Sequence, residues 1–252
     1  MSSLININQD QNTEPPPFGP LDIVYRDEYV VVIEKPAGLL VHRSYLARRE
    51  RWFAMQLLRD QIGQHVFPVH RLDRPTSGLL MFALSAEVAA LLGEQFSAGG
   101  IHRGYHAVVR GYAPDQGRID YPLKEELDKI ADQKAKKNKA AQDAVTNFVT
   151  LERVELPFKV STKHDTTRYS LVQLAPETGR KHQLRQHLAH LRHPIVGDTR
   201  HGDGRHNDFF RTHFNCHRLL LAATKLSFHH PISKTPVVLE QALPEEFKLA
   251  FR

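Results

Sequence analysis

Residues 70–78 read HRLDRPTSG and run directly into the apolar stretch LLMFAL of residues 79–84. One carboxylate, Asp73, lies between Arg71 and Arg74, just before a turn rich in proline, threonine, serine and glycine. Nearby cations favour the ionised form of a carboxylate, and loops at strand ends commonly present reactive groups. The stretch therefore predicts a turn that leads into a buried strand, and it makes Asp73 a candidate for chemistry.

The residue types alone leave three roles open for Asp73. A carboxylate can act as a covalent nucleophile, as a general base, or as one half of a structural ion pair that holds the turn. No second acid lies nearby in the sequence to form the paired carboxylates of a glycoside hydrolase. On this chemistry alone, the structural ion pair is the simplest interpretation.

Composition places the chain among globular proteins with a basic character. It has 252 residues, of which 41% are hydrophobic and 25% charged, and its net charge is +6. A basic domain is a candidate for binding phosphates. The single cysteine, Cys216, excludes an internal disulfide and a paired-cysteine metal motif. No apolar run approaches the roughly 20 residues of a membrane span, and no signal peptide is indicated, so we expect a cytoplasmic protein without a membrane partner.

The hydrophobic pattern predicts one mixed α+β domain over residues 21–252, after a disordered tail at residues 1–20. Several strands with scattered helices indicate a mainly antiparallel sheet with flanking helices. Ser85 is the expected N-cap of one helix, and Gly63 the expected C-cap of another. Strands are expected at residues 29–33, 79–84, 105–111, 144–155, 169–174, 219–226 and 237–240, helices at 53–62, 86–96 and 181–191, and a loop at 197–216.

A second group of polar residues lies at 179–188, with the sequence GRKHQLRQHL. On a helix, Lys181 and Arg185 are four residues apart and share a face. The start of such a helix offers backbone N–H groups and a positive dipole end to a phosphate. For Lys181, a solvated charged face is the simpler interpretation.

Sixteen histidines raise the question of a metal site. His187 and His190 have a spacing that zinc ligands use on helices, and His201, Asp203 or His206 could complete such a site. The interleaved arginines and lysine oppose binding of a dication, and the HExxH base of zinc hydrolases is absent. Core or surface histidines are therefore the expected interpretation, and no metal is predicted.

Four separate blocks of the chain resemble the RluA family of pseudouridine synthases. They are EKPAG at residues 34–38, HRLDRPTSG at 70–78, GRKHQLR at 179–185 and HPIVGD at 193–198. The resemblance implies the pseudouridine synthase fold, a mixed and mainly antiparallel sheet with a central RNA-binding cleft. It also implies isomerisation of uridine to pseudouridine in RNA, after the base is flipped out of its stack, without a cofactor.

The resemblance implies a role for each candidate site residue. Asp73 matches the catalytic aspartate, and Arg185 matches the arginine that forms an ion pair with it. Tyr105 matches a tyrosine that stacks on the target base, although a core strand aromatic is the ordinary interpretation. Arg71 matches an arginine that enters the RNA helix where the nucleotide has left, and an ion pair within the turn is the alternative. Leu221 departs from the family, which usually has histidine there.

Further motifs concern the substrate. Residues 41–44 (VHRS), 60–67 (DQIGQHVF), 125–132 (EELDKIAD) and 180–182 (RKH) resemble family members that modify uridine 65 of tRNA. Ribosomal RNA is the alternative substrate within the family. Outside it, a non-catalytic RNA-binding protein and a histidine-based metallohydrolase are the rival hypotheses. The lysine-rich residues 134–139 predict a cationic loop that neutralises RNA phosphates.

Overall fold

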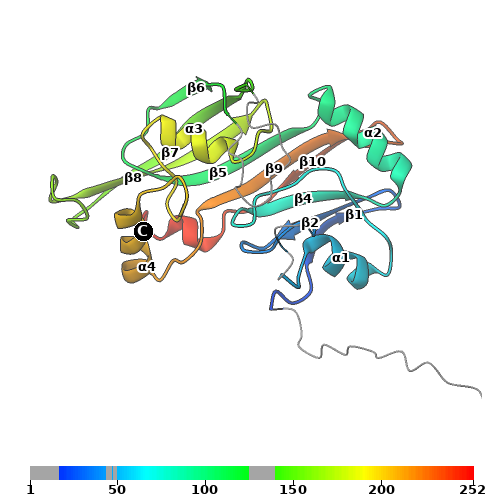
Figure 1. Cartoon of the computed structure of the whole chain (residues 1–252), viewed down its shortest axis with the longest axis horizontal. Coiled ribbons are helices and arrows are strands. Elements are labelled where there is room, and N and C mark those ends of the chain that lie inside the picture. Colours follow the sequence, from blue (N-terminus) through cyan, green and yellow to red (C-terminus); the bar gives the residue numbers. More distant parts are fainter. Residues whose placement is uncertain (1–16, 44–46, 48–49, 125–139) are drawn as a thin grey trace, which may run out of the picture.

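A computed structural model describes residues 17–43, 47, 50–124 and 140–252, and in this part of the chain one sheet contains ten strands (Figure 1). Most of the expected tail (residues 1–16) and the lysine-rich segment 134–139 lie outside the described residues.

The strand order is β1-β2-β4-β9-β5-β8-β7-β6, with β3 paired to β4 and β10 paired to β9. The strands are β1 (Asp22–Arg26), β2 (Val30–Lys35), β3 (Phe67–Pro68), β4 (Ser77–Ala83), β5 (His102–Arg110), β6 (Gln116–Asp120), β7 (Val145–Leu156), β8 (Thr167–Pro176), β9 (Leu221–His229) and β10 (Pro236–Glu240). The helices are α1 (Ala54–Ile62), α2 (Ala86–Ser97), α3 (Gln183–His190), α4 (Gly204–Phe214) and the short 3-10 helix η2 (Glu245–Lys248).

Helices cover both faces of the sheet because buried side chains alternate along its strands. On β2, Val31 and Ile33 belong to the core cluster that includes α1 and α3, whereas Val30 and Val32 belong to the cluster that includes α2. A third cluster packs α4 and the C-terminal residues against β8 and β9. None of the helices in the described residues is long and apolar enough to cross a bilayer.

Most of the predicted elements are confirmed, including their caps. Gly63 ends α1 in the left-handed conformation, with φ of 66°. The Ser85 hydroxyl accepts a hydrogen bond from the backbone N–H of Val88 at the start of α2. Each of the seven expected strands and three expected helices corresponds to an element at the same place in the chain.

The expectation of a loop throughout residues 197–216 is wrong, because this stretch contains helix α4. Its sequence, GRHNDFFRTHF, has few strong helix formers, so local propensity gives little signal. Tertiary packing supplies the stability instead, since Phe210 is buried against the Tyr169 ring. Asp203 caps the start of the helix through its side chain, and Asn215 ends it in the left-handed conformation.

The two halves of the sheet meet where β4 lies beside β9. This is the parallel pair of the sheet, with Ser77 opposite Ala222 and Gly78 opposite Ala223, while the other strand pairs are antiparallel. Gly78 has φ of +106°, and a Cβ at this position would lie 2.1 Å from the carbonyl oxygen of Ala223. Glycine is therefore required at the end of the 70–78 turn for the halves to join. The result is the mainly antiparallel α+β sheet that the sequence predicted.

Candidate active site

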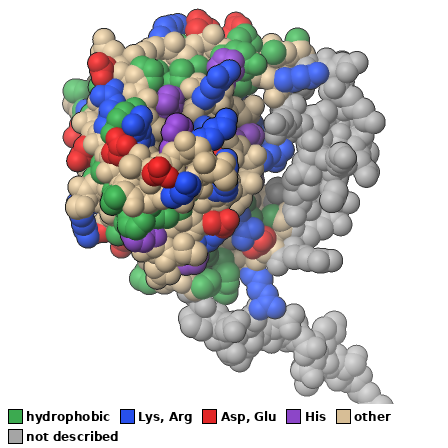
Figure 2. Space-filling view, turned by 90° about the vertical axis from the view of Figure 1, so that its left-hand side faces the viewer, with side chains coloured by type: hydrophobic (Ala, Val, Ile, Leu, Met, Phe, Trp, Pro, Cys, Tyr) green, Lys and Arg blue, Asp and Glu red, His purple; other side chains and the backbone are tan. Residues whose placement is uncertain are grey.

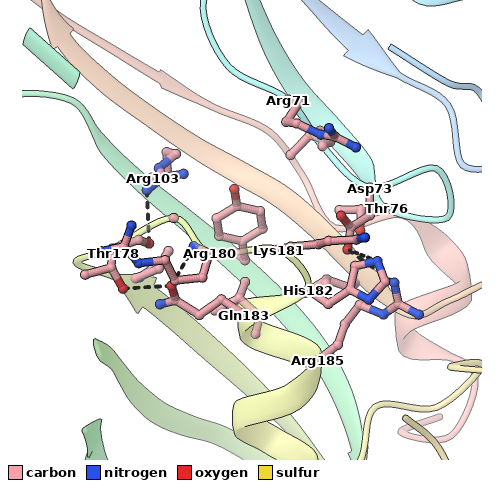
Figure 3. A pocket seen from close by; sticks show the side chains of 16 residues that line it. Arg71, Asp73, Thr76, Arg103, Thr178, Arg180, Lys181, His182, Gln183 and Arg185 are labelled. Carbon is pink, nitrogen blue, oxygen red and sulfur yellow. Dashed lines mark hydrogen bonds and ion pairs between the residues drawn. The ribbon is translucent and has the colours of Figure 1, made fainter. Parts of the chain in front are cut away.

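A pocket of about 230 Å³ opens where the 70–78 turn, β5 and the start of α3 meet (Figure 3). Its lining includes the four candidate residues of the sequence analysis, Arg71, Asp73, Tyr105 and Arg185. These residues span more than a hundred positions of the chain, and the fold brings them to one place. All four candidate residues therefore line one pocket.

Backbone contacts hold Asp73 at the wall of the pocket. The backbone N–H of Thr76 donates to the carbonyl oxygen of Asp73 at 3.1 Å, and the N–H of Gly38 donates to that of Arg74 at 2.8 Å. The Arg74 side chain points elsewhere, to the Gly38 carbonyl and the Glu50 carboxylate. Of the two arginines that flank Asp73 in the sequence, Arg74 is thus engaged with other partners.

Lys35, at the end of β2, is a contributor that the sequence analysis missed. Its side chain is fully buried, and Nζ donates to the carbonyl oxygens of Pro36 at 2.8 Å, Leu39 at 2.7 Å and Arg74 at 3.2 Å. Burial lowers the pKa of Lys35 to about 7, although the nearby Asp73 carboxylate acts in the opposite direction. Lys35 therefore ties the 34–38 turn to the turn that carries Asp73.

Arg185 joins Asp73 to a second carboxylate, Asp198. Its Nε and Nη2 donate to Asp198 at 2.7 and 2.8 Å, and its Nη1 lies 3.2 Å from Oδ2 of Asp73. The predicted contact between Arg185 and Asp73 is therefore present. Burial raises the pKa of Asp198, but hydrogen bonds from Arg185 and from the backbone N–H of His201 and Arg200 outweigh it and lower the pKa overall. This array keeps a positive charge beside Asp73.

His182 lies on the opposite side of Asp73 from the turn and immediately precedes α3. Its Nε2 is 3.9 Å from Oδ2 of Asp73, and its Nδ1 is 3.1 Å from Nε2 of His201. Burial lowers the pKa of His182 to about 4, so the imidazole is neutral near pH 7. The sequence analysis placed this histidine in the GRKHQLR and RKH motifs and gave it no role of its own.

Tyr105 belongs to the core cluster, as the ordinary interpretation expected, and it also lines the pocket. It is only 6% exposed, and burial raises the pKa of its hydroxyl. Arg71 is exposed at the rim, across the pocket from Arg185 (Figure 3). Aromatic rings and guanidinium groups can both stack on planar rings.

Arg103 forms the far end of the pocket from Asp73 and was also missed (Figure 3). Its guanidinium lies 5.1 Å from the centre of the Phe96 ring, and its Nη2 donates to the carbonyl oxygen of Thr178 at 3.3 Å. A Cβ at Gly179 would lie 3.3 Å from Nη1 of Arg103, so the glycine gives this side chain room. The pocket thus has an anionic group at one end and a cationic group at the other.

A larger cavity, of about 580 Å³, lies between the start of β8 and α4. Two of its arginines, Arg110 and Arg168, are paired with Asp203 and Glu155. The side of the molecule shown in Figure 2 likewise has Lys and Arg interspersed with Asp and Glu. This mixed surface offers less unpaired positive charge to a polyanion than the smaller pocket does, so the smaller pocket is the stronger candidate.

The candidate metal ligands do not come together in the described residues, where no three His, Cys, Asp or Glu side chains form a possible metal site. Both ring nitrogens of His187 have partners, the Thr146 hydroxyl and the Tyr121 carbonyl oxygen. His190 stacks on the Tyr121 ring with 3.7 Å between centroids. These two histidines have structural contacts.

Comparisons with known proteins agree with this geometry. A family model described as RNA pseudouridylate synthase matches residues 29–190. The chain is 58% identical over 225 residues to tRNA pseudouridine synthase C of Vibrio cholerae, covering 89% of this chain and 92% of the relative. It is 57% identical to the protein of the same name from Pasteurella multocida, covering 87% and 90%. The solved structure of human RNA Pseudouridylate Synthase Domain Containing 4 superposes with a TM-score of 0.68 at 25% identity, covering 91% of each chain.

The chain therefore belongs to the RNA pseudouridylate synthase family, within the RluA type that its motifs indicated. It is a pseudouridine synthase, an isomerase that acts on RNA.

Proposed function

We propose that this protein converts uridine 65 of tRNA into pseudouridine, with Asp73 as the catalytic residue. The observation that carries the proposal is the position of Asp73 at the wall of a pocket, with one carboxylate oxygen 3.2 Å from Arg185. The choice of tRNA is supported by the similarity to proteins named tRNA pseudouridine synthase C. The expected cytoplasmic location and the single catalytic domain over residues 21–252 stay predictions.

Access to the uridine requires that it leave its stack, at a cost of a few kcal/mol. Arg71, exposed at the rim, would fill the gap left in the RNA, since a planar guanidinium can stack and donate several hydrogen bonds. Tyr105 would hold the flipped base inside the pocket by stacking against it. Neither residue takes part in bond breaking in this proposal.

The reaction breaks the bond between C1′ and N1 and forms a bond between C1′ and C5; the C5 proton is released to solvent, and N1 takes up a proton. Asp73 would act in its ionised form, either by attack on the sugar or by abstraction of a proton. Arg185 holds the carboxylate in place through the contact of its Nη1 with Oδ2. Substrate and product contain the same atoms, so the chemistry calls for no cofactor.

The test is tritium release from C5-labelled uridine in unmodified tRNA transcripts. Wild-type protein should release tritium, while Asp73→Ala and the near-isosteric Asp73→Asn should lose release and keep most of their affinity for tRNA. Transcripts with cytidine at position 65 should give no release, which maps the site.

Three results would change the proposal. An active Asp73→Ala protein would refute the mechanism. Release from wild type with the cytidine-65 transcript would move the site elsewhere in tRNA. Release from ribosomal RNA and none from tRNA would establish the alternative substrate.

A further inference from the structure

Two side chains point to the same oxygen of Asp73: one belongs to α3, and the other to the residue that precedes α3. Nη1 of Arg185 and Nε2 of His182 lie 3.2 and 3.9 Å from Oδ2. The first is within hydrogen-bond range, and the second is slightly beyond it. Such contacts in an empty site are often long and shorten when substrate binds. His182 is therefore placed to become a second donor to the carboxylate.

The backbone directs His182 toward the carboxylate. His182 has φ of 55° and ψ of 25°, the left-handed conformation that few residues other than glycine adopt. Its carbonyl oxygen already accepts from the N–H of Gln186 at 2.9 Å, in the first turn of α3. The side chain is only 15% exposed. A conformation of this kind is retained where the surrounding contacts hold it in place.

Two tautomers of His182 are compatible with its contact to His201, and they differ in what Nε2 presents to Asp73. Nδ1 of His182 faces Nε2 of His201 at 3.1 Å, so one ring donates and the other accepts. If His182 donated from Nδ1, its Nε2 would present a lone pair to the carboxylate of Asp73. If His201 donates to Nδ1 of His182 instead, the proton of His182 is on Nε2. This N–H then points to the negatively charged carboxylate of Asp73. The second arrangement is the favourable one.

One buried carboxylate organises both groups that face Asp73. Asp198 holds the Arg185 guanidinium through two hydrogen bonds. Its Oδ1 also accepts from the backbone N–H of Arg200 and of His201, each at 2.9 Å. The turn that carries His201 is thus fixed to the same residue that fixes Arg185.

We propose that His182 is a positioning residue for the isomerisation: held as the Nε2–H tautomer by His201, it donates to Oδ2 of Asp73 when the nucleotide binds. With Arg185 on the same oxygen, Oδ1 is then the oxygen that faces the ribose. His182 keeps its proton throughout and transfers none. The inference rests on the proposed role of Asp73 as the catalytic residue.

The test compares His182→Asn with His182→Gln. Asparagine tolerates the left-handed backbone, and its short amide stays near His201 but does not reach Asp73, whereas the longer glutamine amide does. In single-turnover assays on tRNA, His182→Asn should lower the isomerisation rate constant about 10- to 100-fold, the effect of losing a hydrogen bond to a charged group. The enzyme concentration for half-maximal rate should stay the same. His182→Gln should recover most of the rate, and His217→Asn, at an exposed histidine, is the matched control.

His201→Ala gives a second, independent test, because it leaves His182 itself intact. It should slow isomerisation in the same way, and the double variant with His182→Asn should be no slower than His182→Asn alone. Thermal unfolding of each variant separates a local effect from loss of the fold. If His182→Asn misfolds, the His201→Ala result decides, and an unchanged rate there overturns the proposal.

Two further outcomes would overturn it. One is a wild-type rate constant in His182→Asn. The other is an unchanged rate constant with a raised half-maximal concentration, which would make His182 a contact for RNA. The failure of the proposed function has different signatures, namely wild-type protein that releases no tritium from any RNA, or an active Asp73→Ala protein.

Discussion

Arg185 supplies one positive charge to two carboxylates that differ in exposure. The Asp198 side chain is 1% exposed and that of Asp73 is 20% exposed. Arg185→Ala would leave Asp198 buried without its cation, and breaking a buried pair in this way costs about 3–5 kcal/mol. We expect that loss in urea unfolding, together with loss of most of the tritium release. Asp73→Ala is the control, since it removes only the more exposed partner and should destabilise far less. Equal stabilities of wild type and Arg185→Ala would contradict this account.

The buried amine of Lys35 joins the 34–38 turn to the turn that carries Asp73. Lys35→Met keeps the length of the side chain and removes the donor to three carbonyl oxygens. We expect a loss of about 3 kcal/mol in the free energy of unfolding, because each buried polar group left unsatisfied costs about 1–3 kcal/mol. Lys225→Met, at an exposed lysine paired with Glu240, should cost less than about 1 kcal/mol. Similar losses in the two variants would show that Lys35 is not a structural donor.

The sequence predicted those residues of the candidate site that lie in recognisable motifs. Arg71, Asp73, Tyr105 and Arg185 were named, and all four line one pocket. The contacts around them were not predictable, because they join side chains that the sequence separates. Asp198 lay within a quoted motif, yet only the fold shows that it holds Arg185. Their proposed chemical roles stay predictions.

The junction of β4 and β9 depends on a single glycine. Gly78→Ala would force a Cβ against the backbone of Ala223 and would impose a left-handed φ on alanine. We expect destabilisation of more than about 3 kcal/mol, since neither strand can move without breaking the join. Gly93→Ala, within α2 where the added Cβ meets nothing, should instead stabilise by about 0.5–1 kcal/mol. Urea unfolding of both variants makes the comparison. A small loss of stability in Gly78→Ala would mean that β4 and β9 do not need to approach closely at this position.

Elements were predictable where burial and periodicity agreed. The strand β4 is buried along its whole length and reads as an apolar run. The strands β1 and β6 lie at the two ends of the sheet order and are mostly exposed, so their sequences lack a clear alternation. Helix α4 was missed because its stability comes from aromatic packing rather than from residues that favour helices. Local sequence therefore identified the centre of the fold better than its periphery.

Histidines that are buried or partly buried are spread through the described residues. Burial lowers the pKa of six of them: His42, His70, His106, His182, His187 and His206. In the unfolded chain, histidines take up protons near pH 6.5, whereas these six stay neutral to lower pH in the folded protein. The unfolded state therefore binds more protons as the pH falls below 6.5, and stability declines.

We expect the free energy of unfolding to fall by about 3 kcal/mol or more between about pH 7.5 and about pH 5.5. Urea unfolding at the two pH values measures it. The carboxylates with lowered pKa start from 3.8 (Asp27, Asp198 and Asp203) or 4.5 (Glu87 and Glu155) and so lose their contribution only in more acidic solution. A loss of stability between these two pH values therefore comes from the histidines and not from the carboxylates. Equal stability at both pH values would show that the buried histidines do not control acid unfolding.

The central place of β9 has a consequence for biosynthesis. This strand lies between β4 and β5 in the sheet, yet it is made only after β5, β6, β7 and β8. At about 5–20 residues per second, a ribosome completes Asp73 roughly 7–30 s before it completes Leu221, which also lines the pocket. A nascent chain thus carries Asp73 without the strand that joins it to the half of the sheet beside Arg185. We expect the capacity to modify RNA to arise only after β9 has been made, so that a nascent chain that stops before Leu221 cannot act on the RNA around the ribosome that is making it.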